Sequence, residues 1–140
     1  MPRPTSFRLP EDLLERLDAE ASRNGTSTTA LVTALLGEGL KTRRFPGIVY
    51  RDGPAGRRAG LVHGPDVWEV IRAIRDASGE GDARLAEVAE ASNLTAGQIR
   101  LAVDFYTAYP DEVDVRIAAD EQAASELDEM LARRTRLLSS

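Results

Sequence analysis

The chain has 140 residues, a formal net charge of −5, no cysteine and one histidine, His63. Its length allows one ordinary domain or two very small ones. Without cysteine a disulfide framework and a thiolate metal site are excluded, and one histidine leaves little for acid–base chemistry. No apolar run approaches the roughly 20 residues that span a bilayer, and MPRPTSFRLPED has no signal-peptide core. We therefore expect a soluble cytoplasmic protein that binds no metal, no cofactor and no membrane.

Charge is distributed unevenly along the chain. Up to Arg58 there are ten Lys or Arg and seven Asp or Glu, which gives a net charge of +3. From Ala59 onward there are eight Lys or Arg and sixteen Asp or Glu, which gives −8. Overall acidity argues against nucleic-acid binding, but the distribution of charge matters more than its sum. The split indicates two ends with different partners, and an anionic partner suits the front end.

The first predicted element is a strand over residues 5–9. Alternation places Phe7 and Leu9 on one face of it. The opposite face carries Pro4, Ser6 and Arg8. A lone strand of this length is not stable as a sheet, so it needs a partner strand.

Two helices are expected after Pro10, and the first of them runs to about Asn24. Gly25 suits the end of a helix, because glycine tolerates the left-handed conformation of a C-cap. The hydroxyl of Thr26 or Ser27 can then cap the second helix. Residues 42–47, TRRFPG, are expected to form a linker. Apolar side chains recur at helical spacing: Leu13, Leu14, Leu17 and Ala21 in the first helix, and Leu31, Val32, Leu35, Leu36 and Leu40 in the second.

A segment of about forty residues is too small to bury a core alone. A second copy of the chain would solve this problem and that of the unpaired strand. The two strands would pair antiparallel, and four helices would close around Phe7 and Leu9. Such a ribbon fits the DNA major groove, where its outward side chains read base edges. We therefore expect a homodimer or a higher even oligomer.

The sequence TSFRLPEDLLERLDAEASRNGTSTTALVTALL resembles the ribbon-helix-helix family of bacterial repressors and antitoxins. The resemblance covers about residues 3–41. It implies that alternate strand residues read bases and that the start of the second helix holds a DNA phosphate. The implied base readers are Pro4, Ser6 and Arg8, although Pro4 replaces the polar residue usual there. The implied phosphate anchors are Thr26, Ser27 and Thr28, through hydroxyls and free backbone N–H groups.

The alternative for the front end is an edge strand followed by a helical hairpin with no DNA role, because strand–proline–helix junctions are common. Arg43 and Arg44 either contact the DNA backbone or form a solvated pair in the linker.

Residues 46–65 contain five glycines and three prolines between two short apolar segments. Residues 48–50 and 59–62 can pair across the DGPAG turn, which predicts a β-hairpin. A phosphate-binding loop is a weaker interpretation, since no GK[ST] follows and no helix opens on these glycines. His63 is expected in a loop without catalytic duty.

A helix is expected to begin at Pro65, which suits a first turn, and ASGEGDA is expected to form a loop. Residues 85–106 follow a helix-turn-helix pattern, and Thr95 and Gln98 have the spacing of a capping box. The outward positions of the second of these helices are Ala96, Gly97, Arg100 and Asp104. They offer one cation against one anion on the acidic half of the chain, so packing is favoured over a second DNA-reading role.

The last segment, residues 111–138, is predicted to form one helix. Val113 starts an apolar stripe on it, which Asp120 and Arg134 interrupt, so a long self-dimerising coiled coil is disfavoured. A tail that lies in a partner's groove fits better, and a tail that folds back onto its own domain is the alternative. The candidate partner-binding residues are Ile117, Ala124, Leu127, Leu131 and Leu138.

The segments FPGIVYRDGPAGRRAGLV and YPDEVDVRIAADEQAASEL, within residues 45–132, are similar to the small helix-turn-helix domain of VapB-type antitoxins. Such proteins are often encoded beside PIN-like ribonuclease toxins. The resemblance implies that the back half binds and silences a toxin.

These patterns predict a mainly α protein. Residues 1–44 would form a ribbon-helix-helix domain for dimerisation and DNA binding. Residues 45–140 would form a β-hairpin, a helix-turn-helix and a long partner-binding C-terminal helix. The predicted function is an antitoxin-like dimeric repressor that binds double-stranded operator DNA and neutralises a PIN-like toxin. The alternative is a stand-alone regulator whose back domain dimerises or senses a small molecule. An enzyme is not expected, because no nucleophile–base–acid set is visible.

Overall fold

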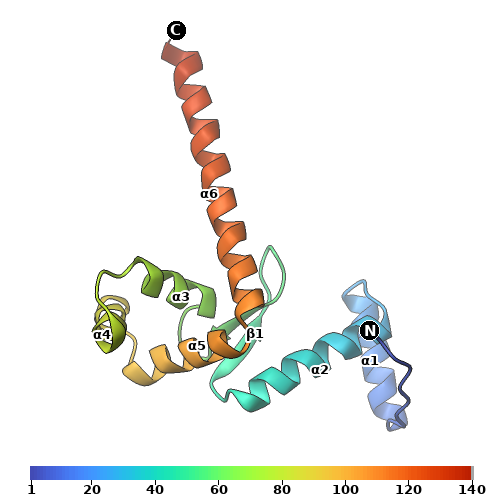
Figure 1. Ribbon diagram of the computed structural model, residues 1–140. Helices are drawn as coiled ribbons and strands as arrows, with labels where there is room; N and C mark the ends of the chain where they lie inside the picture. Colours follow the sequence, from blue (N-terminus) through green and yellow to red (C-terminus); the bar gives the residue numbers. More distant parts are fainter. Residues whose placement is uncertain (140) are drawn as a thin grey trace. The chain divides into compact units, whose positions relative to one another are not determined.

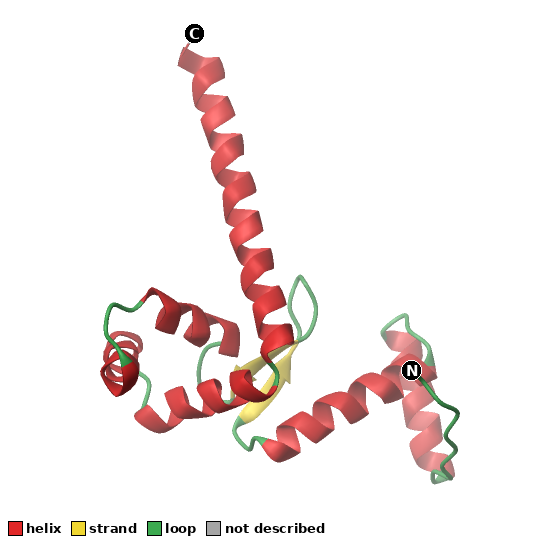
Figure 2. Cartoon of the chain, in the orientation of Figure 1, coloured by secondary structure: helices red, strands yellow, loops and turns green. Residues whose placement is uncertain are grey.

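The computed structural model describes residues 1–139 and is mainly helical. Its chain divides into two compact units, Met1–Arg44 and Phe45–Ser140. The division falls at the position where the sequence places its domain boundary. Figure 1 follows the elements along the chain, and Figure 2 shows that one small sheet accompanies the helices. None of the helices in the described part of the chain is long and apolar enough to cross a membrane.

The front unit contains two helices, α1 (Glu11–Arg23) and α2 (Thr28–Arg44). Pro10 precedes α1, and the acidic side chains of Glu11 and Asp12 lie in its first turn. Their negative charges interact favourably with the positive end of the helix dipole and stabilise the helix. Gly25 has a φ of +65°, a conformation that glycine adopts without the strain of a Cβ atom. Because α2 continues to Arg44, the expected linker is shorter than predicted. Its first three residues, Thr42 to Arg44, are helical.

The back unit begins with the predicted β-hairpin. Strand β1 (Ile48–Arg51) pairs antiparallel with β2 (Arg58–Leu61), with Ile48 opposite Leu61 and Arg51 opposite Arg58. Ile48 and Leu61 are buried, so one face of this short sheet contributes to the core. Gly47 precedes β1 with a φ of +102°, and a Cβ atom there would lie 2.8 Å from Leu101 Cδ2. Only glycine therefore fits at this close approach.

Four helices follow the hairpin: α3 (Val67–Asp76), α4 (Gly81–Ser92), α5 (Ala96–Ala108) and α6 (Pro110–Ser139). Two sequence predictions about their starts are wrong. Helix α3 has Asp66 as its N-cap rather than starting at Pro65, and the Glu69 side chain accepts a hydrogen bond from the Asp66 N–H at 2.9 Å. Helix α4 begins at Gly81, so the ASGEGDA loop is shortened to residues 77–80.

The turn between α4 and α5 has the predicted chemistry. Asn93 adopts the left-handed conformation with φ 57° and ends α4. The Thr95 hydroxyl accepts a hydrogen bond from the Gln98 backbone N–H at 3.1 Å, and Gln98 Oε1 accepts one from the Thr95 N–H at 2.9 Å. This reciprocal arrangement is the capping box that the spacing of the two residues predicts.

The core of the back unit forms where the hairpin, α3, α5 and the start of α6 meet. Phe105 and Val67 are completely buried, and Ile99 is 1% exposed. The Phe105 ring makes an edge-on contact with Phe45, with ring centroids 5.7 Å apart. Full burial of an aliphatic or aromatic side chain of this size contributes about 1.5–3 kcal/mol to stability. This unit therefore has what the front unit lacks, a buried core within one chain.

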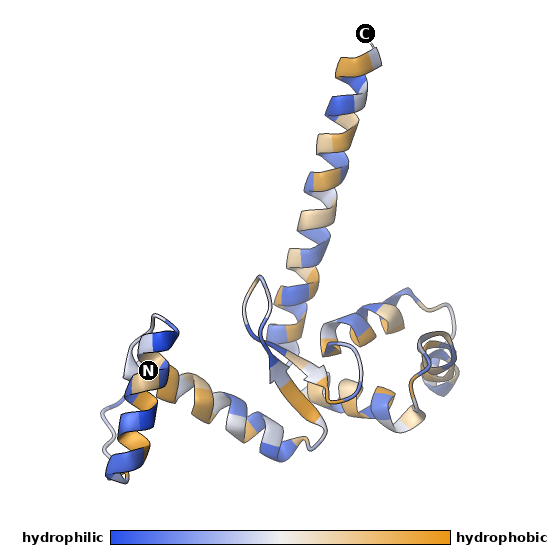
Figure 3. Cartoon of the chain, turned by 180° about the vertical axis from the view of Figure 1, so that it is seen from behind, coloured by the Kyte–Doolittle hydropathy of each residue, from blue (hydrophilic) through white to orange (hydrophobic). Residues whose placement is uncertain are grey.

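Helix α6 has a docked part and an exposed part. Val113 and Ile117 are buried in the core, and Asp120 forms an ion pair with Arg72 of α3. From residue 121 to residue 139 every position is exposed to solvent. We call residues 121–139 the tail. In Figure 1 the tail extends past the rest of its own unit, and Figure 3 shows apolar and polar bands alternating along it.

Candidate nucleic-acid interface and partner surfaces

The first ten residues are exposed and have no regular secondary structure in the single chain. They include the candidate base readers Pro4, Ser6 and Arg8. Phe7 is 80% exposed and Leu9 is 38% exposed. A strand needs hydrogen bonds from a second strand, and within residues 1–139 the two strands are those of the hairpin. The ribbon therefore requires a second copy of the chain and stays a prediction.

The candidate phosphate anchors surround the start of α2. Ser27 Oγ accepts a hydrogen bond from the Ala30 N–H at 3.0 Å, so Ser27 caps the helix. The Thr26 N–H donates to the Ala21 carbonyl oxygen at 3.0 Å and closes the turn after α1. The Thr28 hydroxyl donates to Asp18 Oδ1 at 2.7 Å. The structure thus brings these residues together, but two of the hydroxyls already have intramolecular roles.

The groups around this end of α2 have opposite electrostatic effects on a bound anion. The first turn of α2 contains no acidic residue, and its unsatisfied backbone N–H groups with the helix dipole attract anions. The Asp18 carboxylate, which holds Thr28, repels them. A phosphate at this place would depend on backbone N–H groups more than on the Thr28 hydroxyl.

The front unit leaves most of its apolar surface uncovered. Among the residues of Met1–Arg44, Ala21 is the one that is buried, and α2 has no buried residue. A groove of about 340 Å³ runs between the two helices and includes Leu13, Leu17, Leu31 and Leu35 in its walls. Exposed apolar side chains of the unit are Phe7, Leu9, Leu14, Leu35, Leu36 and Leu40. Exposed apolar side chains on both helices and on the first ten residues leave this unit without a covered core in the single chain.

The helix pair α4 and α5, which the sequence predicts as a helix-turn-helix, uses its apolar face for the core. Ile99, Ala102 and Phe105 of α5 are buried. The outward positions that the sequence singles out, Ala96, Gly97, Arg100 and Asp104, are exposed. This outer face has one cation and one anion, which gives a DNA backbone no net attraction.

One of the five candidate partner-binding residues is not available to a partner. Ile117 is 2% exposed and belongs to the core of the back unit, so its assignment as a contact residue is wrong. The apolar stripe predicted for this helix is present on α6, but its first two turns pack against α3 and α5. Ala124, Leu127, Leu131 and Leu138 are exposed on the tail. Met130 and Leu137, 64% and 76% exposed, add apolar surface that the sequence prediction omitted.

A polar cluster fixes the docked part of α6. Arg75 Nη2 lies 2.5 Å from Asp114 Oδ1, and the Tyr106 hydroxyl donates to the same oxygen at 3.0 Å. The hydrogen bond from Arg75, followed by that from Tyr106, holds the pKa of Asp114 below its ordinary value. The same contact with Asp114 raises the pKa of Arg75. The cluster ties α3, α5 and α6 together, which gives the Asp114 carboxylate a structural role.

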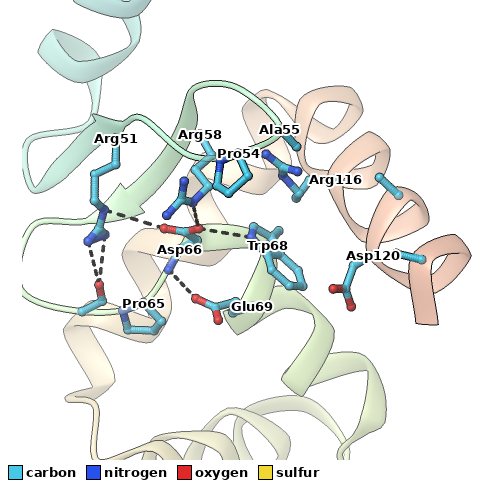
Figure 4. A pocket seen from close by; sticks show the side chains of 13 residues that line it. Arg51, Pro54, Ala55, Arg58, Pro65, Asp66, Trp68, Glu69, Arg116 and Asp120 are labelled. Atoms are coloured by element: carbon cyan, nitrogen blue, oxygen red, sulfur yellow. Dashed lines mark hydrogen bonds and ion pairs between the residues drawn. The ribbon is translucent and has the colours of Figure 1, made fainter. Parts of the chain in front are cut away.

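A second polar cluster, centred on Asp66, was not predicted. Asp66 is 7% exposed and forms an ion pair with Arg58, and the Trp68 Nε1–H donates to it at 3.2 Å (Figure 4). Arg51 Nε lies 3.7 Å from Asp66 Oδ1. Since Arg51 and Arg58 are opposite each other in the hairpin, a carboxylate is needed to balance them. The sequence prediction ended its strands next to Arg51 and Arg58, so it did not place these two arginines opposite each other and did not indicate the buried acid.

No known protein family, curated protein or solved structure matches this chain. Its function must therefore be argued from its own residues. Within residues 1–139, no group of three or more His, Asp or Glu side chains is arranged to hold a metal ion.

Proposed function

We propose that this protein is an antitoxin-like, homodimeric transcriptional repressor. Its front unit binds double-stranded operator DNA through a β-ribbon shared by two chains, and its back unit neutralises a PIN-like toxin. The observation that carries the proposal is the uncovered apolar surface of the front unit. The family resemblance of residues 3–41 supplies the mode of DNA binding.

The first step is dimerisation. A two-helix unit with one buried residue gains too little from burial to offset the entropy of ordering its chain. Each Å² of apolar surface removed from water contributes about 25 cal/mol. A second copy can cover Leu35, Leu36 and Leu40 and can pair with the extended segment that holds Phe7 and Leu9. The same contact supplies the missing core and the missing strand.

The second step is DNA recognition. In a paired ribbon, alternation places Pro4, Ser6 and Arg8 on the face away from the helices. Arg8 is the one charged side chain of these three, and an arginine contact to a base is worth about 1–3 kcal/mol of discrimination. In this proposal the N-terminus of α2, with Thr26, Ser27 and Thr28 around it, contacts a DNA phosphate. Residues 1–44 contain seven Lys or Arg and six Asp or Glu, a net charge of +1, so the front unit has no net negative charge to repel DNA.

The third step is binding of a protein partner by the tail. Leu127, Leu131 and Leu138 form an exposed apolar stripe on a helix, which is how amphipathic helices bind grooves. The tail also carries Glu121, Glu126, Asp128 and Glu129. These carboxylates complement the basic RNA-binding surface expected of a PIN-like ribonuclease.

A second candidate function is a stand-alone regulator whose back unit senses a small molecule. The observation that favours it is an open cavity in the back unit, lined in part by Arg51, Trp68 and Arg116. The two functions share the same front unit and differ in what the back unit binds. Copurification of the chain with the product of a co-transcribed PIN-like gene would favour the toxin.

The test of DNA binding is a mobility-shift assay with the full chain and the DNA upstream of its own coding region. We expect a specific complex that survives an excess of scrambled competitor DNA. Arg8→Ala should abolish the preference for the operator and leave the dimer intact. Ser27→Ala should weaken binding to all sequences alike, as loss of a phosphate contact does. Unchanged affinity and selectivity of Arg8→Ala would show that the ribbon does not read the DNA.

A further inference from the structure

The back unit contains a cavity of about 560 Å³, within the usual size range of small-molecule sites. Its walls come from the hairpin loop, the start of α3 and the middle of α6 (Figure 4). Its lining includes Pro54, Ala55, Trp68, Arg116, Ala119 and Ala123. The cavity lies inside one unit, so its shape does not depend on the front unit.

Most charged groups of the cavity wall have partners within the protein. Arg51 donates to the carbonyl oxygens of Leu61 at 2.7 Å and Gly64 at 2.9 Å. Arg58 is paired with Asp66. Two further wall carboxylates are also engaged: Asp120 with Arg72, and Glu69 with the Asp66 N–H at 2.9 Å.

Arg116 differs from the other charged groups of the wall. Its side chain is half-buried on α6, and within residues 1–139 it makes no ion pair or side-chain hydrogen bond. It lines the same cavity as Ala55 of the hairpin loop (Figure 4). A guanidinium group has five N–H donors and no acceptor, and it binds carboxylates with two parallel hydrogen bonds. The cavity thus offers one uncommitted cation.

The rest of the wall near Arg116 is apolar. Trp68 is half-buried, and its indole N–H is held by Asp66, which fixes the orientation of the ring. Pro54 and Ala55 lie on the hairpin side, and Ala119 and Ala123 lie on α6. Small side chains next to a fixed indole ring leave room for a flat apolar group.

We propose that this cavity binds a small organic acid with one carboxylate and a flat apolar body. The carboxylate contacts Arg116, and the apolar body lies against Trp68. The wall has three arginines and three carboxylates, but Asp66 is paired with Arg58, Asp120 is paired with Arg72 from outside the wall, and Glu69 accepts a hydrogen bond from the Asp66 N–H. Arg116 is therefore the charged group of the wall that a ligand can pair with, and it calls for an anion. The proposal concerns the back unit alone and holds whether or not the front unit binds DNA.

Trp68 is the only tryptophan of the chain, so its indole N–H gives one separate signal in a nuclear magnetic resonance correlation spectrum. We propose titrating the isotope-labelled full chain with benzoate, benzamide and benzylamine up to millimolar concentrations. These probes share a flat ring and differ in charge. Benzoate should shift the Trp68 signal with saturation, and the other two should not. A saturable shift of equal affinity with benzamide, or no shift with benzoate, would overturn the proposal.

Two variants and one control make the test specific. Arg116→Gln should weaken benzoate binding at least about tenfold, which corresponds to the loss of a charge-assisted hydrogen bond. Ala119→Leu should reduce binding by filling the cavity next to Arg116. The control is Arg100→Gln, an exposed arginine on α5, which should bind benzoate as the unaltered chain does. Unchanged benzoate affinity in both Arg116→Gln and Ala119→Leu, with the rest of the spectrum intact, would place any binding elsewhere.

Discussion

The Thr28 hydroxyl at the start of α2 donates a hydrogen bond of 2.7 Å to Asp18 Oδ1 of α1. This contact places a negative charge beside the helix end that the resemblance assigns to a DNA phosphate. A carboxylate next to a phosphate costs binding free energy, and the effect is stronger at low ionic strength. The contact therefore has a structural benefit for the helix pair and a cost for DNA binding.

The first prediction follows from this cost. Asp18→Asn keeps a hydrogen-bond acceptor for Thr28 and removes the negative charge, so affinity for all DNA sequences should rise a fewfold. The measurement is a mobility-shift titration at low and at high salt. The matched control is Asp12→Asn, which removes the same charge from an exposed position on α1 where Asp12 pairs with Arg16. An equal gain in both variants would mean that Asp18 acts only through net charge.

The second prediction concerns the two parts of α6. Ile117 is buried in the core and Leu131 is 49% exposed on the tail, although one apolar stripe contains both. Ile117→Ala should lower the free energy of unfolding of the back unit by about 2–5 kcal/mol. Leu131→Ala should change it by about 0.5 kcal/mol or less. Urea unfolding followed by Trp68 fluorescence measures both. Equal losses would mean that the tail docks onto its own unit.

The contrast between Ile117 and Leu131 shows which features of α6 can be predicted from the sequence and which cannot. Helical periodicity predicts α6 and its apolar face, because spacing alone decides which residues share a face. It does not predict which turns of that face are covered, since this depends on where α3 and α5 end in space. Ile117 and Leu131 therefore received the same role from the sequence and have different ones in the structure.

Local hydrogen-bonding patterns were predicted better than long-range polar contacts. The Thr95–Gln98 capping box and the β1–β2 hairpin are set by residues a few positions apart. The Arg75–Asp114 pair joins residues on different helices, and nothing in the spacing of the two residues indicates it. The cap of α3 was misplaced for a related reason. Asp66 is also the buried partner of Arg58, and a proline beside it was the stronger local signal.

The third prediction is a pH dependence of stability. The pKa of Asp114 is lowered in the folded chain below its ordinary value of 3.8, first by the hydrogen bond from Arg75. A lowered pKa in the folded state stabilises the fold above the unfolded value, and this contribution is lost as the pH falls through the folded value. The free energy of unfolding should therefore fall as the pH drops below about 4.

Asp114→Asn should remove this part of the pH dependence. The variant should be less stable than the unaltered chain at neutral pH, and the difference should shrink as the pH is lowered through the acid range. Urea unfolding at a series of pH values measures it. Asp104→Asn, which alters an exposed carboxylate on α5, should keep the pH dependence of the unaltered chain. If Asp114→Asn keeps it too, the cluster with Arg75 and Tyr106 does not contribute to stability.

The fourth prediction separates partner binding from DNA binding. Replacing Leu127 and Leu131 with aspartate puts charges on the apolar stripe of the tail and should release a toxin bound there. DNA affinity should stay the same, because the tail belongs to the back unit. A pull-down beside a mobility-shift assay on the same variant measures both properties. The control is Val115→Asp, which changes an apolar residue of α6 that is 69% exposed and lies outside the tail. Retention of the toxin by the double variant would exclude the stripe as its binding site.

The central claim is that the front unit is completed by a second copy of the chain. Sedimentation equilibrium of the full chain at micromolar concentration tests it most directly. We expect twice the chain mass of 15.2 kDa, and dissociation in Leu36→Asp, which places a charge on the uncovered face of α2. Val115→Asp, a matched change on the back unit, should remain dimeric. A monomer in which the front unit is folded and unfolds cooperatively would show that this unit needs no second copy of the chain.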